Sequence, residues 1–204
     1  MKNKNLYISI TFLVLFIINT LLVILGKMTL IDEEVHLMVI SNVSEFTSNL
    51  MHAITFLGST IWMVGLCLVL FIIFMITKHK KTAYSTAGIL IISTIFNNVI
   101  KFIIRRPRPE YITVKESSFS YPSGHMMASV TLYGFLIYLL LKANIKKSYK
   151  IIFIILLSIL TILIGTSRIY LGAHFFSDIF GGALLSLSII FFYVYLDEKR
   201  SLRD

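Results

Sequence analysis

The chain has 204 residues, of which 57% are hydrophobic and 14% are charged, and its mean hydropathy is +0.86. This composition is too apolar for a soluble globular domain and indicates an integral membrane protein. The net charge of +9 does not indicate a nucleic-acid-binding protein, because the basic residues are spread between hydrophobic segments and form no stripe. Since no change in composition marks a linker, we expect residues 1–204 to form a single membrane domain.

Long apolar runs predict the membrane spans. A helix needs about 18 or more apolar residues to cross the hydrocarbon core. Six runs reach that length alone or with the polar residues that border them: 6–26, 60–77, 82–100, 126–141, 151–166 and 175–196. The fourth and fifth runs are short, and polar residues can complete them only where they line a cavity inside the protein. The sequence therefore predicts an all-α, polytopic membrane protein built as a bundle of six transmembrane helices.

An additional amphipathic helix is expected after the first span. Apolar residues recur there at steps of three and four and share one face of a helix: Val35, Val39, Val43, Phe46, Leu50, Ile54 and Leu57. Such a helix rests on the outer membrane surface or packs against the bundle. We expect no catalytic role for His36 and His52 in this segment, or for His79 in a basic turn.

The distribution of basic residues predicts the orientation. With six spans, both termini and the lysine-rich turns at 78–81 and 142–150 lie on one side, which carries 12 of the 19 Lys and Arg residues and 3 of the 10 Asp and Glu residues. The positive-inside rule makes that side cytoplasmic. Against this trend, five cations share one outer loop between the third and fourth spans: Lys101, Arg105, Arg106, Arg108 and Lys115. Their concentration indicates a need for positive charge on the outer face.

The first of three polar islands lies in that loop and reads Lys101-x6-Arg108-Pro109. All three prolines of the chain, Pro107, Pro109 and Pro122, fall between the third and fourth spans, so this connection is a constrained loop. An arginine fork offers paired donors that match phosphate oxygens, and lysine adds a compact point charge. The same pattern also suits a solvated surface or a contact with lipid headgroups.

The second island, Ser123-Gly124-His125, opens the fourth span. Ser123 is a favoured N-cap residue, and Gly124 lets the backbone approach a ligand closely. The free N–H groups and the dipole of the helix attract an anion, which His125 would face. Taken alone, this tripeptide is also a common helix start.

The third island contains Arg168, His174 and Asp178. The last two are four residues apart and share a face if the sixth helix begins near Ala173. A carboxylate that accepts a hydrogen bond from one ring nitrogen leaves the other nitrogen free to attack, and it stabilises the positive charge that develops. Arg168, at the end of the fifth span, can join a phosphate site. An isolated pair of this kind also suits an ordinary capping or buried hydrogen bond.

The predicted topology brings all three islands to the outer face, and ionisable residues beside apolar spans are usually functional. In order, spacing and residue type the islands resemble the signature of the type 2 phosphatidic acid phosphatase superfamily, which includes membrane lipid phosphatases. The resemblance implies that His174 is a nucleophile that forms a phosphohistidine, that Asp178 orients it and that His125 is the general acid. It also implies a set of phosphate-binding residues: Lys101, Arg108, Ser123, Gly124 and Arg168. These donors can stabilise a phosphoryl group without a metal, so we expect no cofactor.

The substrate implied by this resemblance is a lipid phosphate from the bilayer, with membrane lipids as the surroundings and no nucleic-acid partner. Undecaprenyl diphosphate suits an outward-facing site and is preferred, phosphatidylglycerophosphate is the close alternative, and phosphatidic acid is a further one. We expect a bacterial plasma membrane protein with cytoplasmic termini and an external active site; its oligomeric state is open.

Three other interpretations remain open at this point. Two histidines and an aspartate suit a zinc or iron site, although converging cations would repel a metal ion. The same site could pass the phosphoryl group to an alcohol as a lipid phosphotransferase. An anion or lipid transporter would use the cations as a binding site, but it gives no reason for the His-x3-Asp pair.

Overall fold

The protein is all-helical. The computed structural model describes residues 3–41, 43–111, 113–114 and 116–201, and no strand occurs among them. Lys115, one of the five cations of the outer loop, lies outside the described residues. The described helices are α1 (Lys4–Ile24), α2 (Thr29–Val39), α3 (Glu45–Phe56), α4 (Thr60–Ile76), α5 (Lys80–Ile104), α6 (Gly124–Lys142), α7 (Lys147–Tyr170) and α8 (Phe176–Ser201).

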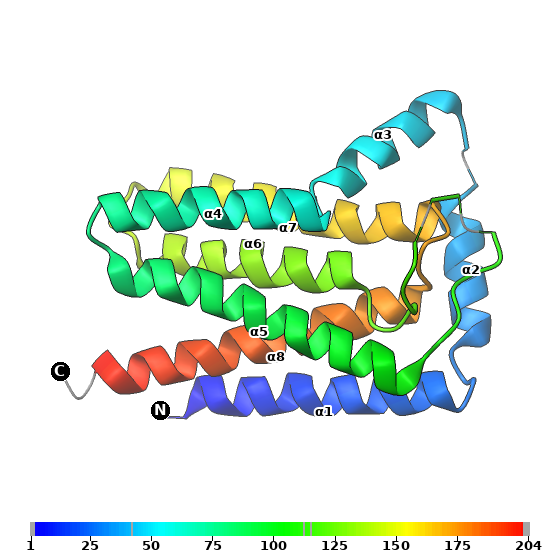
Figure 1. Cartoon of the computed structure of the whole chain (residues 1–204), viewed down its shortest axis with the longest axis horizontal. Coiled ribbons are helices and arrows are strands. Elements are labelled where there is room, and N and C mark those ends of the chain that lie inside the picture. Colours follow the sequence, from blue (N-terminus) through cyan, green and yellow to red (C-terminus); the bar gives the residue numbers. More distant parts are fainter. Residues whose placement is uncertain (1–2, 42, 112, 115, 202–204) are drawn as a thin grey trace.

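The long helices account for the predicted spans. α1, α5, α6, α7 and α8 are each long and apolar enough to cross a membrane. α4 has 17 residues, and it meets the same criterion together with α3 as a pair bent by 44°. The described residues therefore contain five candidate spans, or six if the bent pair counts as one. These helices pack side by side with both termini at one end of the bundle (Figure 1). The predicted all-α, polytopic class is confirmed.

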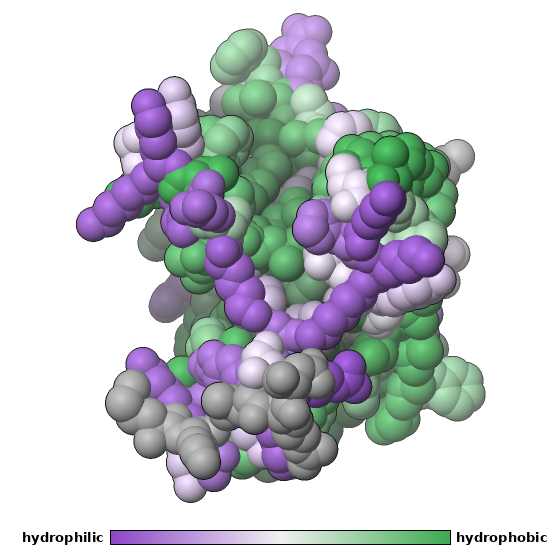
Figure 2. Space-filling view, turned by 90° about the vertical axis from the view of Figure 1, so that its left-hand side faces the viewer, coloured by the Kyte–Doolittle hydropathy of each residue, from purple (hydrophilic) through white to green (hydrophobic). Residues whose placement is uncertain are grey.

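The end of the bundle that carries the termini is hydrophilic. Figure 2 views this end and shows hydrophilic side chains gathered around it, with hydrophobic side chains behind them. Asp197 of α8 pairs with Lys81 of α5 at 2.8 Å and with Lys142 of α6 at 2.6 Å. The hydroxyl of Tyr138 also donates to Asp197 at 2.6 Å. These contacts join three helices near their ends.

The segment after α1 forms two helices instead of one. α2 ends at Val39, and α3 begins only at Glu45. The cause is Ser44, whose side chain accepts from the N–H of Thr47 while the Thr47 hydroxyl accepts from the N–H of Ser44 at 2.8 Å. This capping box starts a new helix and interrupts the apolar periodicity that predicted a continuous one. α2 lies across the end of the bundle against α7 and α8, whereas α3 projects outward (Figure 1).

α6 lies at the centre of the bundle. It contacts α4, α5, α7 and α8, and its Leu132 and Phe135 are fully buried. The surrounding helices expose large apolar side chains such as Ile61, as a lipid-facing surface requires. Hydroxyl groups add contacts between helices: Ser9 of α1 donates to the carbonyl oxygen of Ser188 in α8 at 2.8 Å. Such a bond inside a membrane contributes about 0.6 to 2 kcal/mol.

Candidate active site

The three polar islands meet at the end of the bundle opposite the termini (Figure 1). α5 ends at Ile104, and its C-cap residue Arg105 has a left-handed backbone (φ 51°). The chain then turns away through Pro107 and Pro109. The turn after α7 contains Gly172 with φ +64°, where a Cβ would lie 2.6 Å from the carbonyl oxygen of Tyr111. Glycine at this position therefore lets the turn between α7 and α8 pack closely on the loop between α5 and α6.

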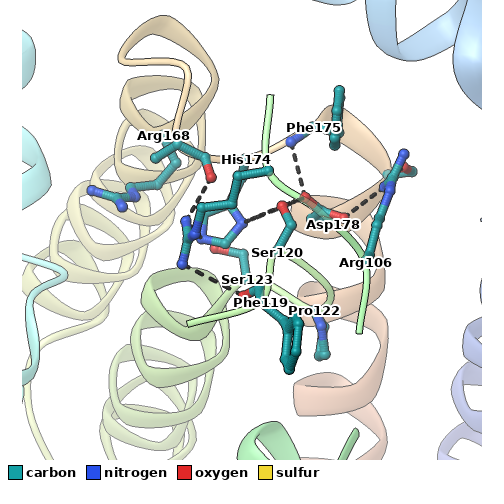
Figure 3. Close-up of polar contacts among 12 residues, drawn as sticks. Arg106, Phe119, Ser120, Pro122, Ser123, Arg168, His174, Phe175 and Asp178 are labelled. Carbon is teal, nitrogen blue, oxygen red and sulfur yellow. Dashed lines mark hydrogen bonds and ion pairs between the residues drawn. The ribbon is translucent and has the colours of Figure 1, made fainter. Parts of the chain in front are cut away.

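His174 and Asp178 lie together. α8 begins at Phe176, so His174 precedes the helix and Asp178 is in its first turn. Nδ1 of His174 is 3.4 Å from Oδ2 of Asp178, and the same oxygen accepts from the N–H of Phe175 at 2.9 Å. Ser120 also donates to this oxygen, and its Oγ lies 3.3 Å from Nδ1 (Figure 3). The Asp178 carboxylate is fully buried among these donors.

The surroundings of His174 define its tautomer. Nη1 of Arg108 is 3.4 Å from Nε2 of His174, and a guanidinium can only donate. Nε2 is therefore the unprotonated nitrogen, and Nδ1 carries the hydrogen on the side of Asp178. Burial lowers the pKa of His174 to about 4, although the Asp178 carboxylate acts in the opposite direction. At neutral pH the ring is uncharged and has a lone pair on Nε2.

His174 lines a cavity of about 290 Å³. The lining includes five of the eight predicted site residues: Lys101, Arg108, Gly124, His125 and His174. It also follows one stripe of α5 from Lys101 to Leu90, which spans about 16 Å along the helix axis. Met63 and Val64 of α4 complete an apolar part. The cavity thus joins a cationic site to a region between two lipid-facing helices.

Glu116 bridges the two arginines of the predicted phosphate-binding set. One carboxylate oxygen is 3.3 Å from Nη2 of Arg108, and the other pairs with Nη2 of Arg168. Arg168, outside the cavity lining, also donates to the Thr55 hydroxyl at 2.9 Å, and Arg108 donates to the carbonyl oxygen of Ala173 at 2.6 Å. A protein carboxylate therefore occupies the space between the two guanidinium groups. Glu116 was not among the site residues predicted from the sequence.

The loop holds Lys101 at the edge of the cavity. Its side chain is buried, and its ammonium group donates to the carbonyl oxygens of Phe119 and Ser120, the latter at 3.3 Å. The positive charge is therefore fixed in position before any ligand binds.

The start of α6 differs in part from the expectation. Ser123 accepts from the N–H of Met126 at 3.4 Å as the N-cap, and its own N–H donates to the carbonyl oxygen of Asp178 at 3.1 Å. Ser123 therefore joins α6 to α8, and it lies outside the cavity lining. Gly124 does line the cavity, and a Cβ there would lie 3.2 Å from Oδ1 of Asn97.

His125 lines the cavity beside Gly58, which lies in the break between α3 and α4. At that break a Cβ on Gly58 would lie 3.4 Å from the His125 ring and 2.5 Å from Cγ2 of Ile164. Ile164 is fully buried and β-branched, so it cannot easily move aside. Glycine at position 58 therefore allows the bent pair to approach α6 and α7 closely.

Two residues without a predicted role extend the site away from the cavity. Arg106 donates from Nη1 to Oδ1 of Asp178 at 2.6 Å (Figure 3). From Nη2 it donates to Oδ2 of Asp32 at 2.8 Å. From the sequence, Arg106 was expected only as one of the loop cations, and no role was predicted for Asp32. No local pattern could pair them, because they are 74 positions apart.

Within the part of the chain that the structure describes, no group of three or more His, Cys, Asp and Glu side chains could hold a metal ion. Lys101 and Arg108 line the cavity instead, and positive charges repel a metal cation.

Fold and site together define an all-helical membrane protein in which a buried His–Asp pair borders a cation-lined cavity at one end of the bundle. The chain belongs to the PAP2 superfamily, that of the type 2 phosphatidic acid phosphatases, whose sequence profile matches residues 82–202. This region is more than half of the chain and contains all eight predicted site residues. The resemblance found in the sequence is confirmed.

Two curated relatives match part of the chain. Phosphatidylglycerophosphatase B of Bacillus subtilis (strain 168) is 38% identical over 126 residues, which are 59% of this chain and 62% of that protein. Lipid phosphate phosphatase delta of Arabidopsis thaliana is 25% identical over 134 residues, which are 59% of this chain and 32% of that protein. The match thus spans less than two thirds of either relative.

Two solved structures are similar over a larger share. A transmembrane PAP2-type phosphatidylglycerolphosphate phosphatase from Bacillus subtilis superposes with a TM-score of 0.87 and 27% identity, covering 95% of this chain and 97% of that one. Aquifex aeolicus LpxE superposes with a TM-score of 0.63 and 23% identity, covering 80% and 93%. The second likeness concerns the fold alone.

Proposed function

We propose that residues 1–204 form a metal-independent phosphatase of membrane lipid phosphates. The observation that carries this proposal is that the two ring nitrogens of His174 have different neighbours. Asp178 lies beside Nδ1, whereas the unprotonated Nε2 lies beside Arg108, and the ring lines the cavity. A neutral nitrogen nucleophile beside fixed cations is what phosphoryl transfer requires. Membership of the superfamily and the phosphatase names of the relatives support the same activity.

In the proposed reaction Nε2 of His174 attacks the phosphorus atom, and the bond from phosphorus to the ester oxygen breaks. His125 donates a proton to that oxygen, so the lipid product leaves and the phosphoryl group stays on the ring. Water then attacks the phosphohistidine while His125 takes its proton, which releases inorganic phosphate and regenerates His174. Asp178 stabilises the positive charge on the phosphorylated ring.

The phosphate is proposed to bind to preset donors: the side chains of Lys101, Arg108 and Arg168 and the helix start at Ser123 and Gly124. Arginine forks and free N–H groups of a helix stabilise the negative charge of a transferring phosphoryl group. For this binding the phosphate must replace the Glu116 carboxylate between Arg108 and Arg168. Ser123 acts indirectly, because its hydroxyl fixes the first turn of α6.

The shape of the cavity fits an amphipathic phosphate. Cations lie at one end of the lining, and Leu90, Met63 and Val64 supply an apolar surface for the first part of a lipid tail. The names of the Bacillus subtilis relatives favour phosphatidylglycerophosphate as the substrate. Undecaprenyl diphosphate, preferred from the sequence, stays a prediction for the same assay.

The experiment measures phosphate release by the purified protein from phosphatidylglycerophosphate, undecaprenyl diphosphate and phosphatidic acid, with and without excess EDTA. We expect release that EDTA does not reduce and that His174→Ala abolishes. Release that depends on an added divalent metal, or that survives in His174→Ala, contradicts the proposed mechanism. Labelled phosphate on an alcohol acceptor instead of free phosphate identifies a phosphotransferase, and uptake of a lipid phosphate without cleavage identifies a transporter.

We also propose that the protein lies in a bacterial plasma membrane with the site on the external face. The supporting observations are the positive-inside distribution of charge and the location of the site opposite the lysine-rich end. Cys67 is the only cysteine, so Glu110→Cys and Lys146→Cys can each be added to Cys67→Ser. A membrane-impermeant thiol reagent should label intact cells at position 110 and not at 146; the reverse result excludes the orientation.

A further inference from the structure

The buried residue of α2 is a carboxylate. Asp32 is 1% exposed, and no other described residue of α2 is buried. Its two oxygens accept from the N–H and the Oγ of Ser177, each at 2.8 Å, and from Arg106 at 2.8 Å. An amphipathic surface helix would bury apolar residues, so the burial of Asp32 requires another explanation.

Arg106 connects this carboxylate to the candidate active site. Its Nη1 donates to Oδ1 of Asp178 at 2.6 Å and to Oγ of Ser177 at 2.7 Å, while Nη2 binds Asp32. The centroid of the Phe175 ring lies 4.2 Å from the guanidinium carbon of Arg106. Arg106 is outside the cavity lining, so it does not reach the substrate site directly.

The two oxygens of Asp178 are thus held by different partners. Oδ2 receives Ser120 and the N–H of Phe175 and faces His174, whereas Oδ1 receives Arg106. With Arg106 bound to Oδ1, the Asp178 carboxylate cannot rotate about its Cβ–Cγ bond without losing this contact. The direction of Oδ2 toward Nδ1, on which the tautomer depends, is therefore fixed from the opposite side.

Asp32 also completes the charge balance. Asp32, Arg106 and Asp178 together carry one net negative charge, whereas Arg106 and Asp178 alone would be neutral. A remaining negative charge stabilises the positive charge that the ring acquires when it is phosphorylated. Asp32 therefore prevents Arg106 from cancelling the charge that Asp178 presents to His174.

α2 has other contacts that hold it to the bundle. Val35 and Val39 pack against a cluster that includes Ile169 and Ile179, and His36 stacks on Tyr111 at 3.7 Å between ring centroids. A buried ion pair is weak evidence for a stabilising role, because its desolvation offsets its attraction. The apolar contacts can dock the helix, which leaves the charges free for another task.

We propose that Asp32 and Arg106 are positioning residues of this enzyme: through Asp178 they fix the orientation and the charge of the His174 ring. This inference rests on the proposed function of His174 as the nucleophile. It makes α2 a part of the active-site support and not a helix on the membrane surface.

The test compares turnover with ground-state binding in the purified full-length protein. Asp32→Asn leaves the neutral pair of Arg106 and Asp178, so it should fold, and we expect kcat to fall roughly 10- to 100-fold. The Ki for inorganic phosphate, which probes Lys101, Arg108 and Arg168, should stay within about twofold. Glu34→Gln removes the same charge from an exposed position of α2 and should have no effect on kcat.

Arg106 is tested in the same way. Arg106→Gln should lower kcat by a similar factor, Arg106→Lys should restore part of it, and Arg105→Gln on the neighbouring exposed residue should leave kcat unchanged. The combined Asp32→Asn and Arg106→Gln variant should lose much less than the product of the two single losses, because both residues act through Asp178. The combined variant removes the charges of Asp32 and Arg106 together, so neither side chain is left as an unpaired charge between α2 and the loop.

The kcat and Ki values of these variants support or overturn the positioning role of Asp32 and Arg106. Wild-type kcat in Asp32→Asn overturns it, and so does a parallel loss of kcat and of phosphate binding, which would indicate a purely structural role. If single variants do not fold, the combined variant and Ser177→Ala, which changes no charge, provide the kcat and Ki values. Activity that survives in His174→Ala refutes the proposed function instead, so the two failures are distinguishable.

Discussion

The two sides of the His174 ring are held in different ways. On the Nδ1 side, Asp178 is fully buried, and Ser120, Phe175 and Arg106 fill its hydrogen-bonding positions. On the Nε2 side lies a cavity, where Arg108 forms an ion pair with the carboxylate of Glu116. That side chain is 21% exposed. The first side consists of permanent contacts within the protein, and the second contains an anion position that a ligand can take.

This difference separates two tasks that a phosphatase of this kind must perform. Orientation of the nucleophile needs groups that stay in place through every step, and a buried, fully bonded carboxylate provides this. Binding and release of phosphate needs cations whose partner can be exchanged, and a partly exposed ion pair provides that. Substitutions on the two sides should therefore change different kinetic constants.

The largest effect is expected on the closed side. Asp178→Asn would support the wrong tautomer of His174, so kcat should fall by roughly 10³- to 10⁴-fold. The Ki for inorganic phosphate should change less than about threefold, because the cations of the cavity are untouched. Asp197→Asn, at the other end of α8, is the matched control and should keep kcat near the wild-type value. Near-normal turnover in Asp178→Asn would exclude the assigned role.

On the open side, Arg108→Gln removes a donor from the phosphate and leaves the contacts of Asp178 intact. We expect kcat/KM to fall by about 10²-fold and the Ki for inorganic phosphate to rise in parallel. Steady-state kinetics with product inhibition measures both. A loss confined to kcat, with unchanged phosphate binding, would remove the distinction between the two sides.

Burial of His174 predicts a dependence of stability on pH. Its pKa of about 4 in the folded protein lies below the usual 6.5, so between these values the unfolded chain takes up a proton that the folded chain does not. The contribution of the neutral His174 ring to the free energy of unfolding should be fully present above pH 6.5. It should be lost as the pH falls toward 4. Between pH 7 and 4.5 the wild type should lose roughly 5 °C more in apparent Tm than His174→Asn. Equal losses in the two proteins would contradict the burial of a neutral ring.

The smallest effect concerns Glu116. Glu116→Gln removes the carboxylate that competes for Arg108 and Arg168, so inorganic phosphate should bind more tightly. A partly exposed ion pair contributes up to about 1 kcal/mol, which corresponds to a decrease of about fivefold in Ki. Weaker phosphate binding in this variant would mean that Glu116 supports the site and does not occupy it.

The sequence predicts the features that depend on local patterns. Runs of apolar residues define the spans, and the four-residue spacing of His174 and Asp178 places them together although α8 begins only at Phe176. The split between α2 and α3 was missed because the pair Ser44 and Thr47 forms a capping box that apolar periodicity does not reveal.

Other parts of the site could not be predicted, for physical reasons. Asp32 and Arg106 come from distant segments that meet only after the bundle has formed. Glu116 could not be predicted because a phosphate site is expected to contain positively charged residues, and Glu116 carries a negative charge. Ser123 was predicted from its place before a helix, and the same cap interaction takes its hydroxyl away from the cavity.

The lack of a side chain at Gly58 has a consequence for how relatives of this protein diverge. A methyl group there would meet Ile164 at 2.5 Å and approach His125, so a mutation at either position changes which residues the other can tolerate. We expect homologues with alanine or serine at position 58 to carry a residue smaller than isoleucine at position 164. The two sites should therefore covary in evolution, although they are far apart in sequence.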